Sequence, residues 1–241
     1  MRSAPRRRIS MFGRNSVAPE SSLHASKQSG GEFDVILKGK PDLPKGDSVV
    51  PASGNKKAKS RTFLDADGQP LRVTFSHHRV MQHTLVFERP IVLEGGVRIN
   101  LGLCNLYGYP ACAGADGDEE LREALLHSIM LELAMTEACF WQSFDSAGAC
   151  PFHCLCISNS PASLKLVLDL FRENPVYTIT PHHPASQFAG EHALHIIAVN
   201  GREKELCAAI RIAQAGLDKE QLLELCTAQA RHGYIRTDTF A

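Results

Sequence analysis

Long hydrophobic runs are missing from this sequence of 241 residues. No stretch reaches the roughly 18–20 consecutive apolar residues that cross a bilayer, so we expect no membrane-spanning helix. The N-terminus also lacks the apolar core of a secretory signal, which makes the cytoplasm the expected location. A transit peptide stays open as an alternative, because the residues before Glu20 are rich in Arg and Ser and contain no acid. However, these residues lack the apolar face at helical spacing that a transit peptide has.

An excess of charge of either sign is also missing, since 26 Lys and Arg balance 26 Asp and Glu. The balance does not hold locally. Residues 1–60 contain 12 basic and 5 acidic residues, which gives this head a charge of +7 and the rest of the chain −7. A basic head can bind anionic partners or lie over the acidic body. We expect the second arrangement and no nucleic-acid partner.

Signs of secretion are absent, yet the chain contains eight cysteines. Disulfides form mainly in oxidising compartments, and here the thiols lie within apolar helical runs. We therefore expect the cysteines to be reduced and buried.

Residues 1–60 have little apolar periodicity and are rich in Ser, Gly, Pro, Arg and Lys. Such a composition does not bury enough apolar surface to offset the entropy of ordering, which predicts a disordered basic tail. Within this tail, Arg6-Arg7-Arg8-Ile9-Ser10 matches the acceptor of a basophilic kinase, so Ser10 is the predicted phosphorylation site.

Residues 61–114 predict a small antiparallel β element. Apolar residues alternate with period two from Leu71 to Phe75 and again from Val97 to Leu103. Between these runs, Glu94-Gly95-Gly96 is typical of a tight hairpin turn. The segment Asp65–Pro70 indicates a second turn, and its carboxylates are too few for a calcium loop.

Residues 115–241 predict helices. Asp116-Gly117-Asp118 supplies an N-terminal cap, and acidic residues follow in the first turn, where the helix dipole favours them. A buried stripe then recurs every four residues: Leu121, Leu125, Ile129 and Leu133. The chain from here to about Cys226 is typical of paired helices.

Two segments of the helical region align without gaps. Gly148–Asn159 reads GACPFHCLCISN, and Gly190–Gly201 reads GEHALHIIAVNG. They resemble the ankyrin repeat, whose pattern G-x-T-P-L-H-x-A-A-x-x-G precedes a second helix. The resemblance implies a structural role for seven residues: Gly148, Pro151, His153, Gly190, Leu194, His195 and Gly201.

Each of these residue types suits a physical task. The first glycine of each copy permits a turn, and proline suits the first turn of a helix. The histidine of the family ties this turn down with hydrogen bonds. Gly201 lets the chain reverse after the first helix, and Asn159 takes the corresponding place in the other copy.

The two copies also depart from the family pattern. Cys150 and His192 replace Thr, and Ala193 replaces Pro. The first glycines are 42 residues apart, whereas the family repeat has about 33. The extra residues, roughly Asn174 to Gln187, predict an elongated finger loop. This feature resembles the cytosolic ankyrin domains of vanilloid-type transient receptor potential channels and related protist or algal ankyrin proteins.

The last residues, Thr239-Phe240-Ala241, stand where a further repeat would begin, because Gln187-Phe188-Ala189 precedes the second copy. We therefore expect that the chain comes from a truncated gene model, is a splice form, or is one piece of a longer channel-like protein.

The expected fold is mainly α: a short ankyrin-type helical solenoid, preceded by the β element and the disordered tail. The resemblance implies a protein-binding or assembly module that engages protein partners through its fingers and concave face. The residues expected to contact a partner are Tyr177, His182, His183 and Phe188. The alternative is a cytosolic regulatory fragment of a channel of this type, associated with a membrane assembly, whose pore region is missing from this chain.

A zinc-binding protein is a further alternative. On a helix, Cys150, His153 and Cys154 lie near one face, and Cys139 or His195 is a conceivable fourth ligand. Against this, the resemblance already gives His153 a structural role. We therefore expect no bound metal and no cofactor.

A small enzyme is the last alternative, because cysteine and histidine can form a catalytic pair. The aromatic loop Leu106–Pro110, with Cys112 after it, would shape a pocket for such a pair or simply connect two elements. No nucleophile elbow, phosphate loop or zinc-protease motif is present, so we expect no catalysis.

Overall fold

The computed structural model describes residues 33–37, 63–76, 83–93, 96–114, 118–136 and 138–229. The predicted phosphorylation site Ser10 and most of the predicted tail lie outside these residues. The strands are β1 (Phe33–Leu37), β2 (Leu71–Ser76), β3 (Thr84–Phe87), β4 (Ile91–Val92), β5 (Arg98–Ile99), β6 (Leu103–Asn105) and β7 (Cys112–Ala113). The α-helices are α1 (Glu119–Thr136), α2 (Ala138–Trp141), α3 (Pro151–Ser158), α4 (Pro161–Glu173), α5 (Ala193–Val199), α6 (Glu203–Gly216) and α7 (Lys219–Thr227). Two 3₁₀ helices are η1 (Leu106–Gly108) and η2 (Pro175–Ile179).

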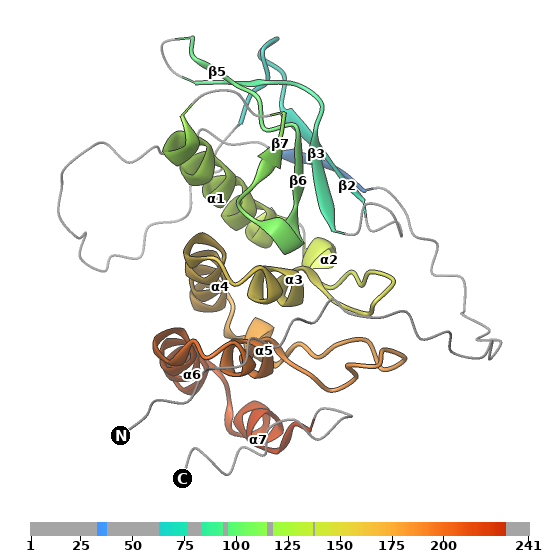
Figure 1. Cartoon of the computed structure of the whole chain (residues 1–241), viewed down its shortest axis with the longest axis vertical. Helices are drawn as coiled ribbons and strands as arrows, with labels where there is room; N and C mark the ends of the chain where they lie inside the picture. The colour runs from blue at the N-terminus through green and yellow to red at the C-terminus, as the bar shows by residue number, and fades with distance from the viewer. Residues whose placement is uncertain are drawn as a thin grey trace, which may run out of the picture.

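The predicted antiparallel β element and the helices after it are both present (Figure 1). Strands β1-β2-β3-β6-β7 form one antiparallel sheet, and β4 pairs with β5. The alternation in β2 has the predicted result, since Leu71, Val73 and Phe75 are fully buried. The predicted turn at Asp65–Pro70 is also present, because the Asp65 carboxylate accepts the backbone N–H groups of Asp67 and Gln69.

The prediction of a wholly disordered tail is wrong at residues 33–37. This segment forms β1 and pairs antiparallel with β2, with Phe33 opposite Phe75. Its sequence, FDVIL, is rich in residues that favour strands. The pairing is made with a strand far along the chain, so local composition alone did not indicate it.

The alternation predicted from Val97 to Leu103 holds only in part. Ile99 and Leu101 are buried, whereas Val97 is 49 % and Leu103 41 % exposed. The reason at Leu103 is Gly102, whose φ of +56° interrupts the extended backbone. A Cβ atom at this position would lie 2.1 Å from the Ala113 carbonyl oxygen, so only glycine allows this approach to β7. After the break, Cys104 takes the buried position instead of its neighbour.

Helix α1 begins as predicted. The Asp118 carboxylate accepts the backbone N–H of Glu120 at 2.9 Å, which caps the helix. Of the predicted stripe, Leu125, Ile129 and Leu133 are fully buried.

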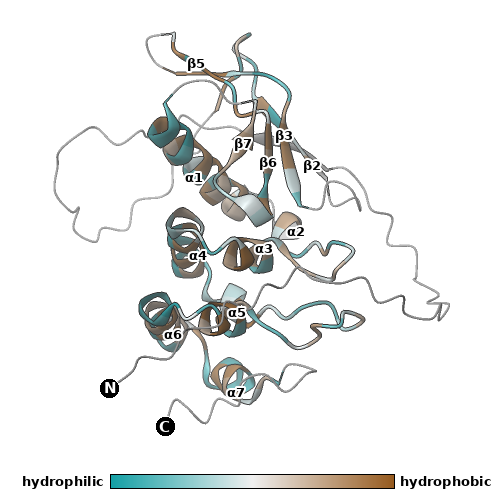
Figure 2. Ribbon diagram, viewed as in Figure 1, coloured by the Kyte–Doolittle hydropathy of each residue, from teal (hydrophilic) through white to brown (hydrophobic). Residues whose placement is uncertain are grey.

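The helices after α2 pack as two hairpins, α3 with α4 and α5 with α6. Helix α3 contacts α5, and α4 contacts α6, so that the second hairpin lies beneath the first in the view of Figure 1. Helix α7 contacts η2. Figure 2 shows α3 as largely hydrophobic and the outer edge of α6 as largely hydrophilic. Each hairpin therefore buries one face against its neighbours.

One hydrophobic core joins the β region to both hairpins. It extends from Phe63 through Trp141 to Ala209 on α6. The ring of Trp141 stacks on Phe152 of α3, with centroids 4.6 Å apart. Where the two parts meet, the hydroxyl groups of Ser158 and Ser160 both donate to the backbone carbonyl of Tyr109, at 2.8 and 2.9 Å.

We predict that Gly148→Ala destabilises the protein more than Gly201→Ala does. Both glycines have a positive φ, +78° and +69°, which costs an alanine about 1–2 kcal/mol. At Gly148 a Cβ would also lie 2.6 Å from the Cβ of Ser186, whereas nothing lies within 4 Å at Gly201. Such overpacking adds about 1–3 kcal/mol. Urea unfolding of both variants measures the difference, and equal losses would contradict the predicted clash.

Candidate functional site

The two repeated segments begin their helices in the same way. In the first, the backbone N–H of Cys150 donates to Nδ1 of His153 at 3.0 Å. In the second, the N–H of His192 donates to Nδ1 of His195, also at 3.0 Å. In each helix, the histidine three residues after the donor thereby accepts a backbone N–H that has no partner within the helix.

The other predicted motif residues lie around these bonds. Pro151 is the first residue of α3, and Leu194 of α5 is almost fully buried. Gly190 has a φ of +82° just before the second helix start. At the reversal after each first helix stand Asn159 with a φ of +55° and Gly201 with a φ of +69°.

The His153 ring makes a second hydrogen bond that reaches the next connection. Its Nε2–H donates to the Thr180 carbonyl at 3.1 Å. The ring also stacks on His182, with centroids 3.7 Å apart. Burial, and then the neighbouring His182, lower the pKa of His153 well below its usual value. The His153 ring must be neutral here, because Nδ1 accepts the hydrogen bond from the Cys150 N–H and so carries no proton.

Residues 174–192 connect the hairpins and include the segment Asn174 to Gln187 that was predicted to form a finger. After η2 the segment folds back on itself, since the His182 N–H donates to the Glu191 carbonyl at 2.9 Å. It is also tied to the turn before α3. There the His183 N–H donates to the Gly148 carbonyl, and the Ser186 hydroxyl to the Ala147 carbonyl. Figure 1 shows the loop extending away from α4 and α6.

Two of the four side chains predicted to contact a partner are buried instead. Tyr177 is 6 % and His182 2 % exposed. Tyr177 packs on Phe152, with ring centroids 4.5 Å apart, and His182 stacks on His153. These aromatic rings gain more by covering the core than by facing water. Partner contact stays a prediction for His183 and Phe188, which are partly exposed.

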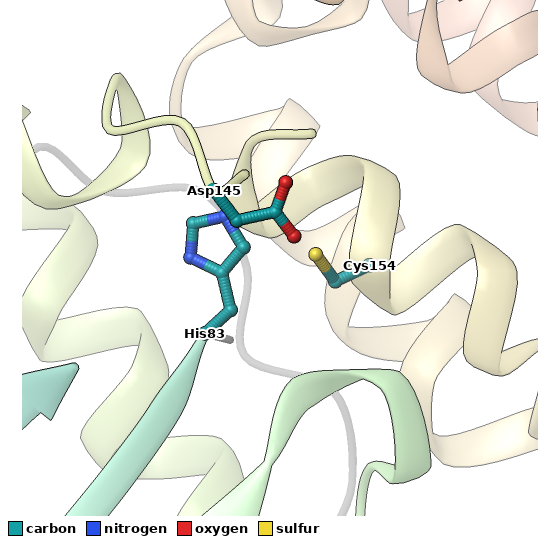
Figure 3. Close-up of side chains that lie close together, drawn as sticks. All are labelled: His83, Asp145 and Cys154. Carbon is teal, nitrogen blue, oxygen red and sulfur yellow. The ribbon is translucent and has the colours of Figure 1, made fainter. Parts of the chain in front are cut away.

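A second group of side chains meets between the β region and α3. His83 stands before β3, Asp145 lies in the loop before α3, and Cys154 lies on α3 (Figure 3). All three are buried, and their ligand atoms lie within 4.8 Å of one another. The sequence prediction missed His83 and Asp145, because neither belongs to a local motif with Cys154.

Hydrogen bonds occupy this cluster. Asp145 accepts the N–H groups of Ala147 and Ala149 on Oδ1 and the Tyr107 hydroxyl, at 2.5 Å, on Oδ2. His83 donates from Nε2 to the Ala149 carbonyl at 2.6 Å. Burial, and then the charge of Asp145, raise the pKa of the Cys154 thiol well above its usual value. A cysteine, a histidine and a carboxylate therefore lie together inside the protein, but the thiol stays protonated and unreactive.

The zinc hypothesis grouped these residues differently. It placed Cys154 with Cys150 and His153, but both ring nitrogens of His153 already bond to backbone atoms. The side chain of Cys139 lies outside the described residues. Among the residues that the structure describes, Cys154 instead lies with His83 and Asp145. A metal ion there would have to replace the hydrogen bond from His83 to the backbone.

The loop after β6 borders a surface pocket. Its volume is about 450 Å³, and its lining includes Asn105, Gly108 and Cys112. The sequence had left open whether this aromatic loop shapes a pocket or only connects two elements. Within Leu106–Pro110, Gly108 borders the pocket, and the 3₁₀ helix η1 packs against α3.

No protein-family model, curated protein or solved structure matches this chain. The ankyrin resemblance therefore stays a prediction from the repeated residues. Among the helices within the described ranges, none is long and apolar enough to cross a membrane.

We predict that Asp145→Ala lowers the free energy of unfolding by about 3 kcal/mol or more. The change leaves two backbone N–H groups and the Tyr107 hydroxyl without their acceptor, and each orphaned buried group costs about 1–3 kcal/mol. The matched control is Asp67→Ala, which removes an exposed ion pair with Arg89 worth about 0–1 kcal/mol. Chemical denaturation compares the two. Similar losses would show that Asp145 does not organise this junction.

We also predict that acid weakens the fold between about pH 6.5 and pH 4. Burial lowers the pKa values of His153, His182, His192 and His195, and that of His192 falls to about 4. Below the unfolded value of about 6.5, the unfolded chain binds protons that the folded chain refuses, so stability falls as the pH falls. Each histidine that stays neutral when folded contributes up to about 1.3 kcal/mol of this loss between pH 7 and pH 5.5.

Thermal melts across this pH range measure the loss. His192→Gln removes one of the four groups and should make the dependence shallower. A melting temperature that stays constant or rises on acidification would contradict the prediction.

Proposed function

We propose that this chain is a cytoplasmic protein-binding module built on two ankyrin-type repeats. The observation that carries the proposal is the histidine at each helix start. His153 and His195 stand at equivalent positions of the two copies, and both accept the backbone N–H three residues earlier. A glycine with positive φ stands five residues before each of them. The same device at the same place in two helical hairpins supports a true repeat.

The packing of the hairpins supports the same proposal. First helices contact first helices, α3 with α5, and second helices contact second helices, α4 with α6. Repeat proteins are held together by such nearest-neighbour contacts, and the loops on one side remain free to bind. A short helical solenoid is the arrangement that these contacts favour.

The connecting loop is the surface that we assign to a protein partner. Its interior contacts, through His182 and Ser186, fix its shape. Pro184, Ala185 and Gln187 are exposed near its tip. A loop held by a rigid base presents its tip at little entropic cost, and such loops are where binding residues gather.

The channel alternative shares this surface. A regulatory fragment of a transient receptor potential-type channel would use the same loop, and its partner would be a membrane assembly. The identity of the bound protein therefore separates the two proposals.

The zinc-binding or enzymatic alternative depends on the buried cluster of His83, Asp145 and Cys154. Zinc should then raise the melting temperature of the wild-type protein and leave that of Cys154→Ser unchanged.

The test of the binding proposal is a comparison of surface variants of the full chain. Ala185→Arg together with Gln187→Arg adds bulk and charge at exposed positions of the loop. We predict that this pair reduces binding of the partner at least about tenfold, because burying an unpaired charge at an interface costs several kcal/mol. Proteins recovered by cross-linking are identified, purified and titrated against each variant.

The matched control is Lys165→Glu together with Arg211→Glu, on exposed positions of α4 and α6 away from the loop. Circular dichroism should show both variants folded. A purified partner that loses affinity only for the loop variant supports the proposal. Equal affinity for both variants, or an equal loss with both, removes the loop from the binding surface.

A further inference from the structure

Two cysteines face each other at the edge of the sheet. Strands β6 and β7 pair antiparallel, and the register places Cys104 directly opposite Cys112. Directly opposed residues in antiparallel strands have Cα atoms about 4.5 or 5.5 Å apart, and their side chains share one face. Both separations lie within the range that a disulfide spans.

The two thiols differ in their access to solvent. Cys104 is fully buried, whereas Cys112 is partly exposed. A small reagent from solvent therefore meets Cys112 first. It reaches Cys104 only through its partner.

The hydrogen bonds of the pair also distinguish them. The Cys112 thiol points its proton toward the Pro110 carbonyl, at 3.5 Å. The hydrogen bond from Cys104 lowers the pKa of Cys112, and the charge of Arg122 on α1 lowers it further, although burial opposes both. The same hydrogen bond, followed by burial, raises the pKa of Cys104. Cys112 is thus the thiol that ionises, and Cys104 is its proton donor.

We propose that Cys112 and Cys104 form a redox site that reacts with hydroperoxides and closes to a disulfide across β6 and β7. The partly exposed Cys112 is the attacking thiol, and the buried Cys104 is the resolving thiol. This proposal concerns the β edge and does not depend on the binding function of the helical hairpins.

The reaction balances in two steps. The Cys112 thiolate attacks the outer oxygen of the hydroperoxide, so that an S–O bond forms and the O–O bond breaks. The alcohol, or water from hydrogen peroxide, leaves with a proton, and Cys112 becomes a sulfenic acid. The Cys104 sulfur then attacks the Cys112 sulfur, the S–S bond forms, and the S–O bond breaks. The Cys104 proton leaves with the hydroxide as water. The dithiol gives up two electrons, which reduce the hydroperoxide.

The remaining described cysteines provide the contrast. Burial raises the pKa of Cys150 to about 12 and raises that of Cys154 and Cys156 as well, so these thiols are inert. Cys207 and Cys226 are exposed, on α6 and α7. If exposure alone governed oxidation, these two would react before Cys112.

The test exploits the sequence around the pair. Trypsin releases Ile99–Arg122 as one peptide that contains Cys104 and Cys112 and no other cysteine. The folded full chain is treated with limiting hydrogen peroxide, its remaining thiols are blocked before unfolding, and the digest is measured by mass spectrometry. We expect this peptide to lose the mass of two hydrogen atoms and to escape the blocking reagent. We also expect it to react several-fold faster than the peptides of Cys207 and Cys226. Dithiothreitol should restore both thiols.

Single variants separate the two roles. In Cys104→Ala, Cys112 should stop at the sulfenic acid, which dimedone traps. In Cys112→Ser, Cys104 should stay reduced, because it has no route to solvent. Cys207→Ser together with Cys226→Ser should leave the closure unchanged. Circular dichroism of each variant confirms that it is folded.

Two results would overturn the proposal. One is a wild-type peptide Ile99–Arg122 that stays reduced while Cys207 and Cys226 are oxidised. The other is a disulfide that joins either Cys104 or Cys112 to a different cysteine.

Discussion

The buried carboxylate of Asp145 is the constraint on which the junction between sheet and helices depends. A charge with almost no access to water persists only if hydrogen bonds replace its hydration. Here two backbone N–H groups of its own loop and the Tyr107 hydroxyl do so. The carboxylate thereby fixes the loop before α3 and aims the Ala149 carbonyl at His83. It also sets the turn at Gly148, whose carbonyl holds the connecting loop through His183. One side chain thus orders the helix start, its contact with the sheet and the base of the candidate binding surface.

His153 continues this arrangement into the second hairpin with a neutral side chain. His153 links the first helix start to Thr180 of the next connection, and its ring stacks on His182. A neutral imidazole accepts with one nitrogen and donates with the other, so it bridges two backbone segments that carboxylate or ammonium groups could not bridge. The hydroxyl of a threonine would reach only the nearer segment. This explains why histidine suits position 153, between the two helical hairpins.

Sequence reasoning succeeded where the signal is local. The cap at Asp118, the alternation of β2 and the glycine and histidine of each helix start are set by neighbours within a few residues. It failed where contacts are distant. His83 and Ala149 are 66 residues apart, so nothing in a local window joins them. The burial of Tyr177 follows from its stack on Phe152, and strand β1 exists through pairing with β2. The sequence pattern also failed to indicate the break at Gly102. The positive φ of this residue shifts the buried face of the chain by one residue.

That shift has a chemical consequence. With an uninterrupted strand, Leu103 would face the core and Cys104 would face solvent. Because Gly102 reverses the parity, Cys104 turns inward and stands opposite Cys112 with its thiol shielded. Burial makes Cys150, Cys154 and Cys156 unreactive. At the sheet edge, by contrast, Cys112 of the Cys104–Cys112 pair is partly exposed. The proposed thiol chemistry thus lies at the sheet edge formed by β6 and β7, and the proposed recognition surface is the loop between the hairpins.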